Sequence, residues 1–111
     1  MKRTMVTLTA TASLLVAMLG SRTTAQTKAA ADVYADKCTT CHGADGKGQT
    51  AKGKKLKVKA VQETVKKMTV AQMEEIVIKG KDPDMDAFGK DLGPDMVKQI
   101  TAYYRSLADK K

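Results

Sequence analysis

Five consecutive residues, Cys38-Thr39-Thr40-Cys41-His42, could carry out a specific chemistry. Their Cys-x-x-Cys-His spacing is the attachment signature of c-type haem. Two thiols on one turn of chain can add to the two vinyl groups of the haem, while the adjacent imidazole is held against the iron. The pattern therefore predicts one covalently bound haem c, anchored by Cys38 and Cys41 and ligated by His42.

Two other chemistries could use the same cysteine pair. A structural zinc site uses about four protein ligands, and this chain offers only two cysteines and one histidine. A redox dithiol of the thioredoxin type would lie in a βαβ pattern, and no strand-like alternation surrounds the pair. Haem attachment is therefore favoured over both.

The sixth iron ligand must be a methionine, another donor or nothing, because His42 is the only histidine. Met73 and Met96 fall on apolar faces of expected helices, where methionine fills the core. Met68 ends a short expected helix and is assigned to packing as well. Met85 stands among charged residues in an irregular segment, so it is the predicted sixth ligand.

The first quarter of the chain has the order of a secretory signal peptide. Met1 to Arg3 is basic, Val6 to Leu19 is apolar, and Ser21 to Ala25 is small and polar. Cleavage after Ala25 would leave residues 26–111 as a single domain in the periplasm. The apolar run is shorter than the roughly 20 residues that a membrane span needs, so a retained anchor is the weaker alternative.

The expected mature domain is small and poor in aromatic residues, with no tryptophan. Domains of this size usually need a staple such as a disulfide, a metal or a cofactor. A covalently held, largely apolar macrocycle would complete such a core.

Charge is unevenly distributed along the chain. The net charge of +8 falls to +5 once Lys2, Arg3 and Arg22 are removed with the leader. One stretch carries six lysines and no acid: Lys47, Lys52, Lys54, Lys55, Lys57 and Lys59. A later segment is rich in aspartate: Asp82, Asp84, Asp86, Asp91 and Asp95. We expect the lysines to dock an acidic face of a redox partner. The alternative is that they are simply solvated. No nucleic-acid partner is expected.

The expected elements before residue 69 place the motif at the end of a helix. Ala-rich Lys28 to Cys38 favours helix, and the glycines of Gly43 to Gly48 predict a tight turn. The lysine-rich stretch is expected to be loop. A short helix should follow, with Val58, Val61 and Val65 on one face.

Two further helices are expected after Thr69. Thr69 with Gln72 forms a capping-box pattern, and Val70, Met73, Ile76 and Val77 then repeat at helical spacing until Gly80. Residues 81–93 are expected to be irregular. Pro94 suits the first turn of a C-terminal helix, whose apolar stripe is Met96, Ile100, Tyr103, Tyr104 and Leu107. The predicted fold class is therefore all-α.

Three segments resemble the small bacterial class I cytochromes c, over Ala29 to Leu107. They are Cys38 to Gly48, Lys79-Gly80 leading to Met85 through Gly89, and Ala102 to Leu107. The resemblance implies several short helices wrapped around one haem, with thioethers at Cys38 and Cys41, His42 as proximal ligand and Met85 as distal ligand. It also implies that the terminal helices cross through Ala30 and Tyr34 on one side and Ile100 and Tyr103 on the other.

Two departures from the resembling family concern the iron ligands. Many relatives carry proline after the ligand methionine, where this chain has Asp86. Many also have a proline, in the loop after the attachment motif, whose carbonyl accepts the hydrogen bond from the proximal histidine; Gly43 to Asp82 contains none. Some partner that orients His42 is nevertheless expected.

These inferences predict a soluble, monomeric one-electron carrier between redox proteins, and not an enzyme, because His and Met would saturate the iron. One alternative is a haem protein with a weak or open sixth position that binds a gas or reduces peroxide. Another is a cytochrome subunit dedicated to one larger oxidoreductase.

Overall fold

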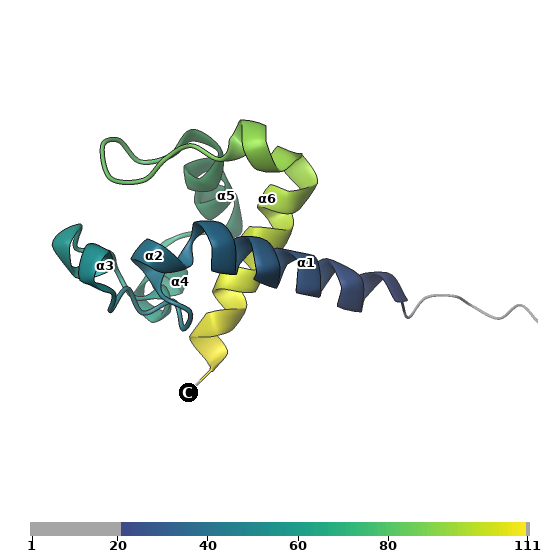
Figure 1. The fold of residues 1–111 in the computed structure, drawn as a ribbon, viewed down its shortest axis with the longest axis horizontal. Helices are drawn as coiled ribbons and strands as arrows, with labels where there is room; N and C mark the ends of the chain where they lie inside the picture. The colour runs from purple at the N-terminus through teal and green to yellow at the C-terminus, as the bar shows by residue number, and fades with distance from the viewer. Residues whose placement is uncertain (1–20, 111) are drawn as a thin grey trace, which may run out of the picture.

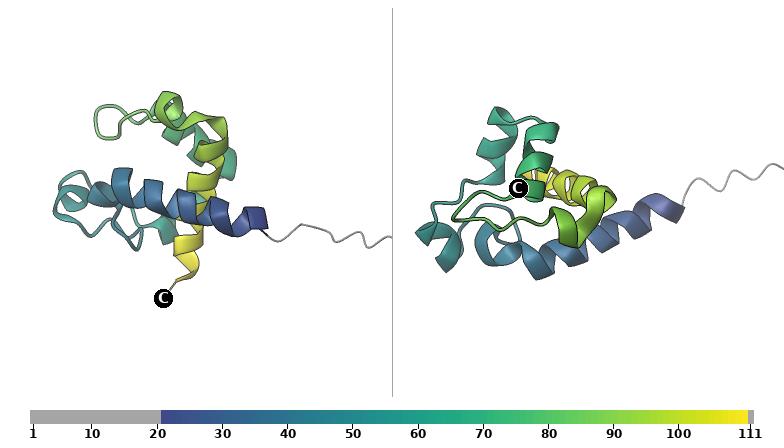
Figure 2. Two further views of the ribbon diagram at one scale, coloured as in Figure 1. Left: turned by 45° about the vertical axis from the view of Figure 1, so that its right-hand side comes forward. Right: turned by 90° about the horizontal axis from the view of Figure 1, so that it is seen from above.

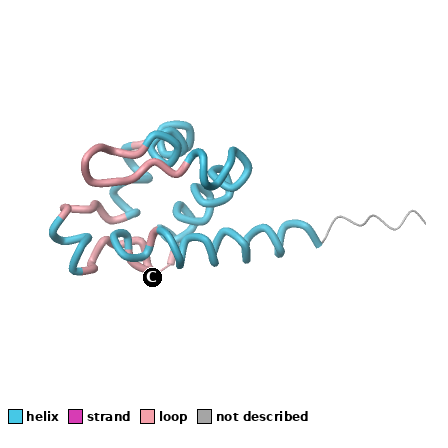
Figure 3. The backbone as a smooth tube through the Cα atoms, turned by 45° about the horizontal axis from the view of Figure 1, so that its top comes forward, coloured by secondary structure: helices cyan, strands magenta, loops and turns pink. Residues whose placement is uncertain are grey.

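Two long helices that cross each other form the frame of the molecule (Figure 1). The computed structural model describes residues 21–110, in which α1 spans Ser21–Lys37 and α6 spans Gly89–Ser106. The shorter helices pack against this frame in different places, some near the C-terminal end of α1 and some against α6, as Figures 2 and 3 show. No strand occurs within the described residues, and the predicted all-α class is confirmed.

The two long helices meet through the residues that the family resemblance implies. Ala30 and Tyr34 of α1 and Ile100 of α6 belong to one buried cluster. The ring of Tyr103 lies 5.2 Å from the ring of Tyr34, at an angle of 56°. The crossing is thus a packing contact between a small residue and aromatic or branched side chains.

Helix α1 begins earlier than the sequence indicates. It starts at Ser21 instead of near Lys28, so it runs past the expected cleavage point after Ala25. The run contains no glycine or proline that would stop a helix. Residues 1–20, most of the expected signal peptide, lie outside the described residues, so the leader and its cleavage stay predictions. Within residues 21–110, no helix has the length and apolar character needed to cross a bilayer.

A glycine-rich turn separates two short helices, α2 (Thr39–His42) and α3 (Ala51–Lys55). Three glycines adopt positive φ, which glycine tolerates without a steric cost: Gly43, Gly46 and Gly48. The expectation of a loop throughout the lysine-rich stretch is wrong, because α3 lies within it. The Thr50 hydroxyl caps this helix by accepting a 2.8 Å hydrogen bond from the Gly53 amide.

Helix α4 (Val61–Lys67) presents part of the apolar face that the sequence indicates. Val61 is completely buried, and Val65 packs against the same cluster. Val58 lies outside the helix, and its amide donates a 2.9 Å hydrogen bond to the Gly53 carbonyl.

Helix α5 (Val70–Lys79) begins and ends where the sequence predicts. Thr69 and Gln72 form the reciprocal capping box, with hydrogen bonds of 2.9 and 3.2 Å. Met73 is only 5% exposed, whereas Val70 is 45% exposed. Val70, the first residue of the apolar repeat, therefore lies toward solvent.

A kink at Gly93 divides α6. Gly93 has φ 73° and ψ 165°, and the straight part of the helix begins at Pro94, as predicted. The segment from Gly89 to Leu92 is helical, which corrects the expectation of irregular chain up to residue 93. Leu92 packs partly buried against the core, and this contact holds the helical turn from Gly89 to Leu92 in place.

The straight part of α6 carries the expected stripe and one residue more. Ile100 is buried, and so is Leu107, the last residue of the stripe, which lies just beyond the end of α6. Three residues of the stripe pack partly buried against the cluster: Met96, Tyr103 and Tyr104. Val97 is 1% exposed and completes the buried face, although the predicted stripe does not include it. A short 3-10 helix, η1 (Leu107–Asp109), closes the chain.

Candidate functional site

The attachment motif lies where α1 passes into α2. The Cys38 amide donates to the Tyr34 carbonyl at 2.9 Å, and the His42 amide donates to the Cys38 carbonyl at 2.9 Å. Both cysteine thiols are free and half-buried. Burial raises the pKa of the Cys38 thiol to about 11, an effect that Lys37 opposes. Cys38 is therefore a protonated thiol at neutral pH, unlike the low-pKa thiolate of a nucleophilic cysteine.

The imidazole of His42 is half-buried. Its Nδ1 atom is buried and has no hydrogen-bond partner within the described residues. The expected partner that orients the ring through a hydrogen bond is thus not found in this part of the chain. Burial lowers the pKa of His42, which favours the neutral imidazole that ligates metals. The ring of Tyr104 lies 5.1 Å away, edge-on at 69°.

The backbone around the motif is fixed by one side chain and by close backbone contacts, none of which the sequence predicted. Thr50 Oγ1 donates to the Thr40 carbonyl at 2.7 Å and approaches the Cys41 carbonyl at 3.3 Å. Gly48 N donates to the His42 carbonyl at 2.8 Å. The Gly53 backbone lies so close to the Cys41 carbonyl that a Cβ atom would overlap it. A threonine at the start of a glycine- and lysine-rich stretch was the available signal, since threonine is a common helix cap.

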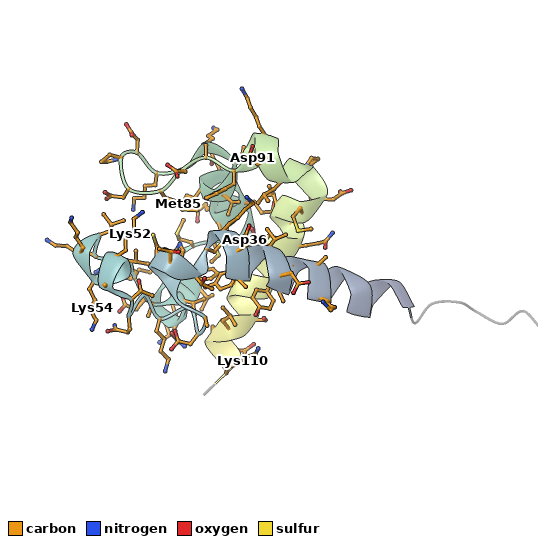
Figure 4. All side chains as sticks on the ribbon, viewed as in Figure 1. Asp36, Lys52, Lys54, Met85, Asp91 and Lys110 are labelled. Carbon is orange, nitrogen blue, oxygen red and sulfur yellow. The ribbon has the colours of Figure 1, made fainter. Side chains whose placement is uncertain are left out.

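Met85 is held in a tight loop after α5. Its amide and carbonyl both bond to the backbone of Lys81, at 2.8 Å each. A Cβ on Gly80, whose φ is 74°, would lie 2.5 Å from the Met85 carbonyl, so the loop requires glycine there. Met85 is half-buried while its neighbours Asp84 and Asp86 are exposed. Figure 4 places Met85 on the side of this loop that faces α2 and α3.

Of the other three methionines within residues 21–110, Met73 and Met96 occupy packed positions. Met73 is buried, and its sulfur accepts a 3.2 Å hydrogen bond from Arg105 Nη1. Met96 packs against the core cluster. Met68 lies just after α4 in extended backbone, is half-buried and lines an open cavity of about 420 Å³ with Ile76. Within residues 21–110, Met68 and Met85 are thus the two methionines outside helices, and Met85 is the one in the long irregular segment after α5.

The residues predicted to bind haem fall into two groups. Cys38, Cys41 and His42 share one turn, whereas Met85 lies on a separate loop. Among the described helices, α2 contacts α1 and α3 but not α5, which leads into the Met85 loop. Helix α2 and the loop that follows α5 lie on the same side of α6 (Figures 1 and 3). Two free thiols, a half-buried imidazole with an unpartnered nitrogen and a half-buried thioether are the donor set that haem c requires, and they fit it.

Zinc binding by protein ligands alone has no comparable support. Within residues 21–110, no group of three or more His, Cys, Asp or Glu side chains is placed to hold a metal ion. A structural zinc site uses about four such ligands.

The basic stretch lies beside the attachment segment. All six of its lysines are exposed, and none forms an ion pair with another described residue: Lys47, Lys52, Lys54, Lys55, Lys57 and Lys59. Three of them lie on α3, which packs against α2. Figure 4 labels Lys52 and Lys54 on this helix. A positive surface therefore lies directly beside the motif.

Comparison with known proteins gives two matches. A sequence model of the family described as cytochrome C oxidase, cbb3-type, subunit III matches residues 25–103. A solved structure, the KustC0563 c-type cytochrome, is similar with a TM-score of 0.65 and 26% sequence identity, over 70% of this chain and 95% of that protein. The family match includes Cys38–His42 and Met85.

Proposed function

We propose that this chain, which belongs to the cbb3-type subunit III family of c-type cytochromes, is a freely diffusing carrier of single electrons between redox proteins. Membership makes it a small class I-like cytochrome c with an all-α fold, a haem protein of electron transfer. The observation that carries the proposal is the donor set: two thiols and an imidazole on one turn, and a thioether on a facing loop.

Cys38 and Cys41 hold the cofactor covalently. Each thiol would supply the sulfur of one thioether to a haem vinyl group, and its hydrogen would pass to the other vinyl carbon. A single attachment motif predicts one haem in this chain. When bound, haem c supplies an iron that gains or loses one electron.

His42 and Met85 are the residues that we propose would ligate the iron. The imidazole of His42 lies beside Tyr104, and the loop from Lys81 to Met85 would present the thioether on its side that faces α2 and α3. With both positions filled by protein, no open coordination site is left for a substrate, so we propose no enzymatic activity. A His and Met pair also raises the reduction potential relative to nitrogen ligands alone.

The lysines around α3 are the proposed docking surface. They are exposed, unpaired within the described residues and adjacent to α2. An acidic face on the partner would be steered to this surface, which brings the haem close to its electron donor or acceptor. We also propose export to the periplasm, on the basis of the leader-like sequence before residue 26.

Mass spectrometry and redox titration test the proposal together. The mature protein should carry the mass of one haem, lost from Cys38→Ala/Cys41→Ala, and should titrate reversibly as a one-electron couple. A colourless wild type, or a double mutant that folds normally without haem, contradicts the attachment that we propose.

A second candidate is a subunit dedicated to one larger oxidoreductase. It is favoured by the name of the matched family, which describes an oxidase subunit. Affinity purification at native expression levels separates the two roles. A freely diffusing carrier elutes as a monomer, whereas a dedicated subunit co-purifies in fixed ratio with its complex.

A further inference from the structure

Two kinds of contact fix the main chain at His42 while leaving its ring free to turn. The His42 carbonyl accepts from Gly48 N at 2.8 Å, and the next carbonyl, of Gly43, accepts from Tyr34 Oη at 2.7 Å. Neither contact touches the imidazole. The plane of the ring must therefore be set by what surrounds the side chain.

A hydrogen bond to Nδ1, the usual means of orienting a ligand histidine, is missing. His42 Nδ1 is buried and unpartnered within residues 21–110. What lies against the ring is Tyr104, at 5.1 Å between centroids and 69° between planes. An edge-to-face arrangement at this distance is a favoured geometry for aromatic rings, because the positive edge of one ring meets the negative face of the other.

Tyr104 is itself held in place. Its ring stacks on Tyr34 at 6.2 Å and 29°, and Tyr34 is only 2% exposed at the crossing of α1 and α6. Tyr34 also donates the hydrogen bond to Gly43. The imidazole is thus connected through two tyrosines to the rigid helix crossing.

We propose that Tyr104 is a positioning residue that sets the orientation of the His42 imidazole, in the place of a hydrogen bond to Nδ1. This inference rests on the proposed ligation of haem iron by His42. Rotation about the side-chain bonds of His42 is limited by the Tyr104 ring, and the direction of the ring plane follows from the packing of α6 on α1.

Tyr103 provides a matched control. It lies on the same helix, is half-buried like Tyr104 and packs on the same Tyr34 ring at 5.2 Å. A leucine at either position removes one aromatic contact with Tyr34. Of the two substitutions, Tyr104→Leu alone removes the contact with His42.

The test is electron paramagnetic resonance of the oxidised holoprotein, with proton NMR of the haem methyl groups, because both report the orientation of the axial ligand plane. Tyr104→Leu should shift the g values and rearrange the methyl resonances, and Tyr104→Phe should restore the wild-type pattern. Tyr103→Leu should lower the melting temperature but keep that pattern. Should Tyr104→Leu not fold, Tyr104→Met is measured in its place.

Two results overturn the inference. One is a wild-type pattern in the non-aromatic Tyr104 variants, and the other is an equal rearrangement in Tyr103→Leu. The wild-type spectrum is recorded first and tests the proposed function separately. A wild type without a histidine-ligated haem removes both proposals, whereas a histidine-ligated wild type with insensitive Tyr104 variants removes this one alone.

Discussion

Replacing Gly53 by alanine should destabilise the protein, although alanine is the better helix former. Gly53 lies inside α3, where glycine to alanine ordinarily gains about 1 kcal/mol of helix propensity. Here the added Cβ would overlap the Cys41 carbonyl and lie 2.6 Å from the Gly48 carbonyl oxygen. Both obstacles are backbone atoms, so neither can rotate away as a side chain could.

The size of the destabilisation follows from two free-energy costs and one gain. Overpacking a tight contact costs about 1–3 kcal/mol. Movement of α3 away from α2 would also break the Thr50 cap, which contributes about 1 kcal/mol. After the propensity gain is subtracted, we expect Gly53→Ala to lose about 1–3 kcal/mol of unfolding free energy. For a domain of this size, each kcal/mol corresponds to about 4–8 °C in melting temperature.

Guanidinium denaturation of the holoprotein, followed by far-ultraviolet circular dichroism, measures this loss. Lys54→Ala is the matched control, because Lys54 occupies the next position of the same helix and is exposed. That change should stay within about 0.5 kcal/mol of wild type. A Gly53→Ala protein that is as stable as wild type, or more stable, would refute the close approach of α3 to the attachment turn.

Four further results are expected. Met85→Ala should lower the reduction potential and let carbon monoxide bind, whereas Met73→Ala, at a buried position, should lose about 2–5 kcal/mol of stability and leave the iron ligands unchanged. Redox titration and carbon monoxide spectra measure these effects, and changed ligation in Met73→Ala would contradict the assignment of Met85 as the ligand. Tyr34→Phe removes a 2.7 Å hydrogen bond to a buried carbonyl and should cost about 1–3 kcal/mol in chemical denaturation; an unchanged midpoint argues against that bond. Burial raises the pKa of Tyr34, so above about pH 10 this tyrosine ionises in the unfolded state but not in the folded state, and the free energy of unfolding should fall by up to about 1.4 kcal/mol per pH unit. Denaturation at a series of rising pH values should show a smaller slope for Tyr34→Phe, and an equal slope would contradict the burial of Tyr34. Lys54→Glu/Lys55→Glu should slow electron transfer to an acidic native partner, and the wild-type rate should fall as salt shortens the Debye length from ~30 to ~8 Å. Stopped-flow rates that respond to neither change would show that these lysines are solvated and do not dock the partner.

Local sequence signals predicted the parts of the fold that depend on neighbouring residues. The capping box of Thr69 and Gln72, the stop at Gly80 and the start at Pro94 each follow from residues within a few positions of one another. The positions facing the core at the helix crossing, such as Ile100, were also predictable, because the packed side of α6 repeats at helical spacing.

What the sequence could not predict depends on segments that meet only in three dimensions. The close approach of Gly53 to Cys41 arises because α3 folds back on α2, and no local pattern encodes it. Likewise, the contact of Tyr104 with His42 requires α6 to be placed against the attachment turn. Helical spacing alone also does not reveal that α5 turns Val70, at the start of its apolar repeat, toward solvent.

Ligation of one haem iron by both His42 and Met85 is the central claim, and an optical spectrum of the purified holoprotein tests it most directly. The oxidised wild type should show the weak near-infrared band of a methionine–iron bond. Its reduced spectrum should not change when carbon monoxide is added, because both axial positions are filled. Absence of the near-infrared band, together with immediate formation of a carbon monoxide adduct, would show an open sixth position and contradict the proposed electron carrier.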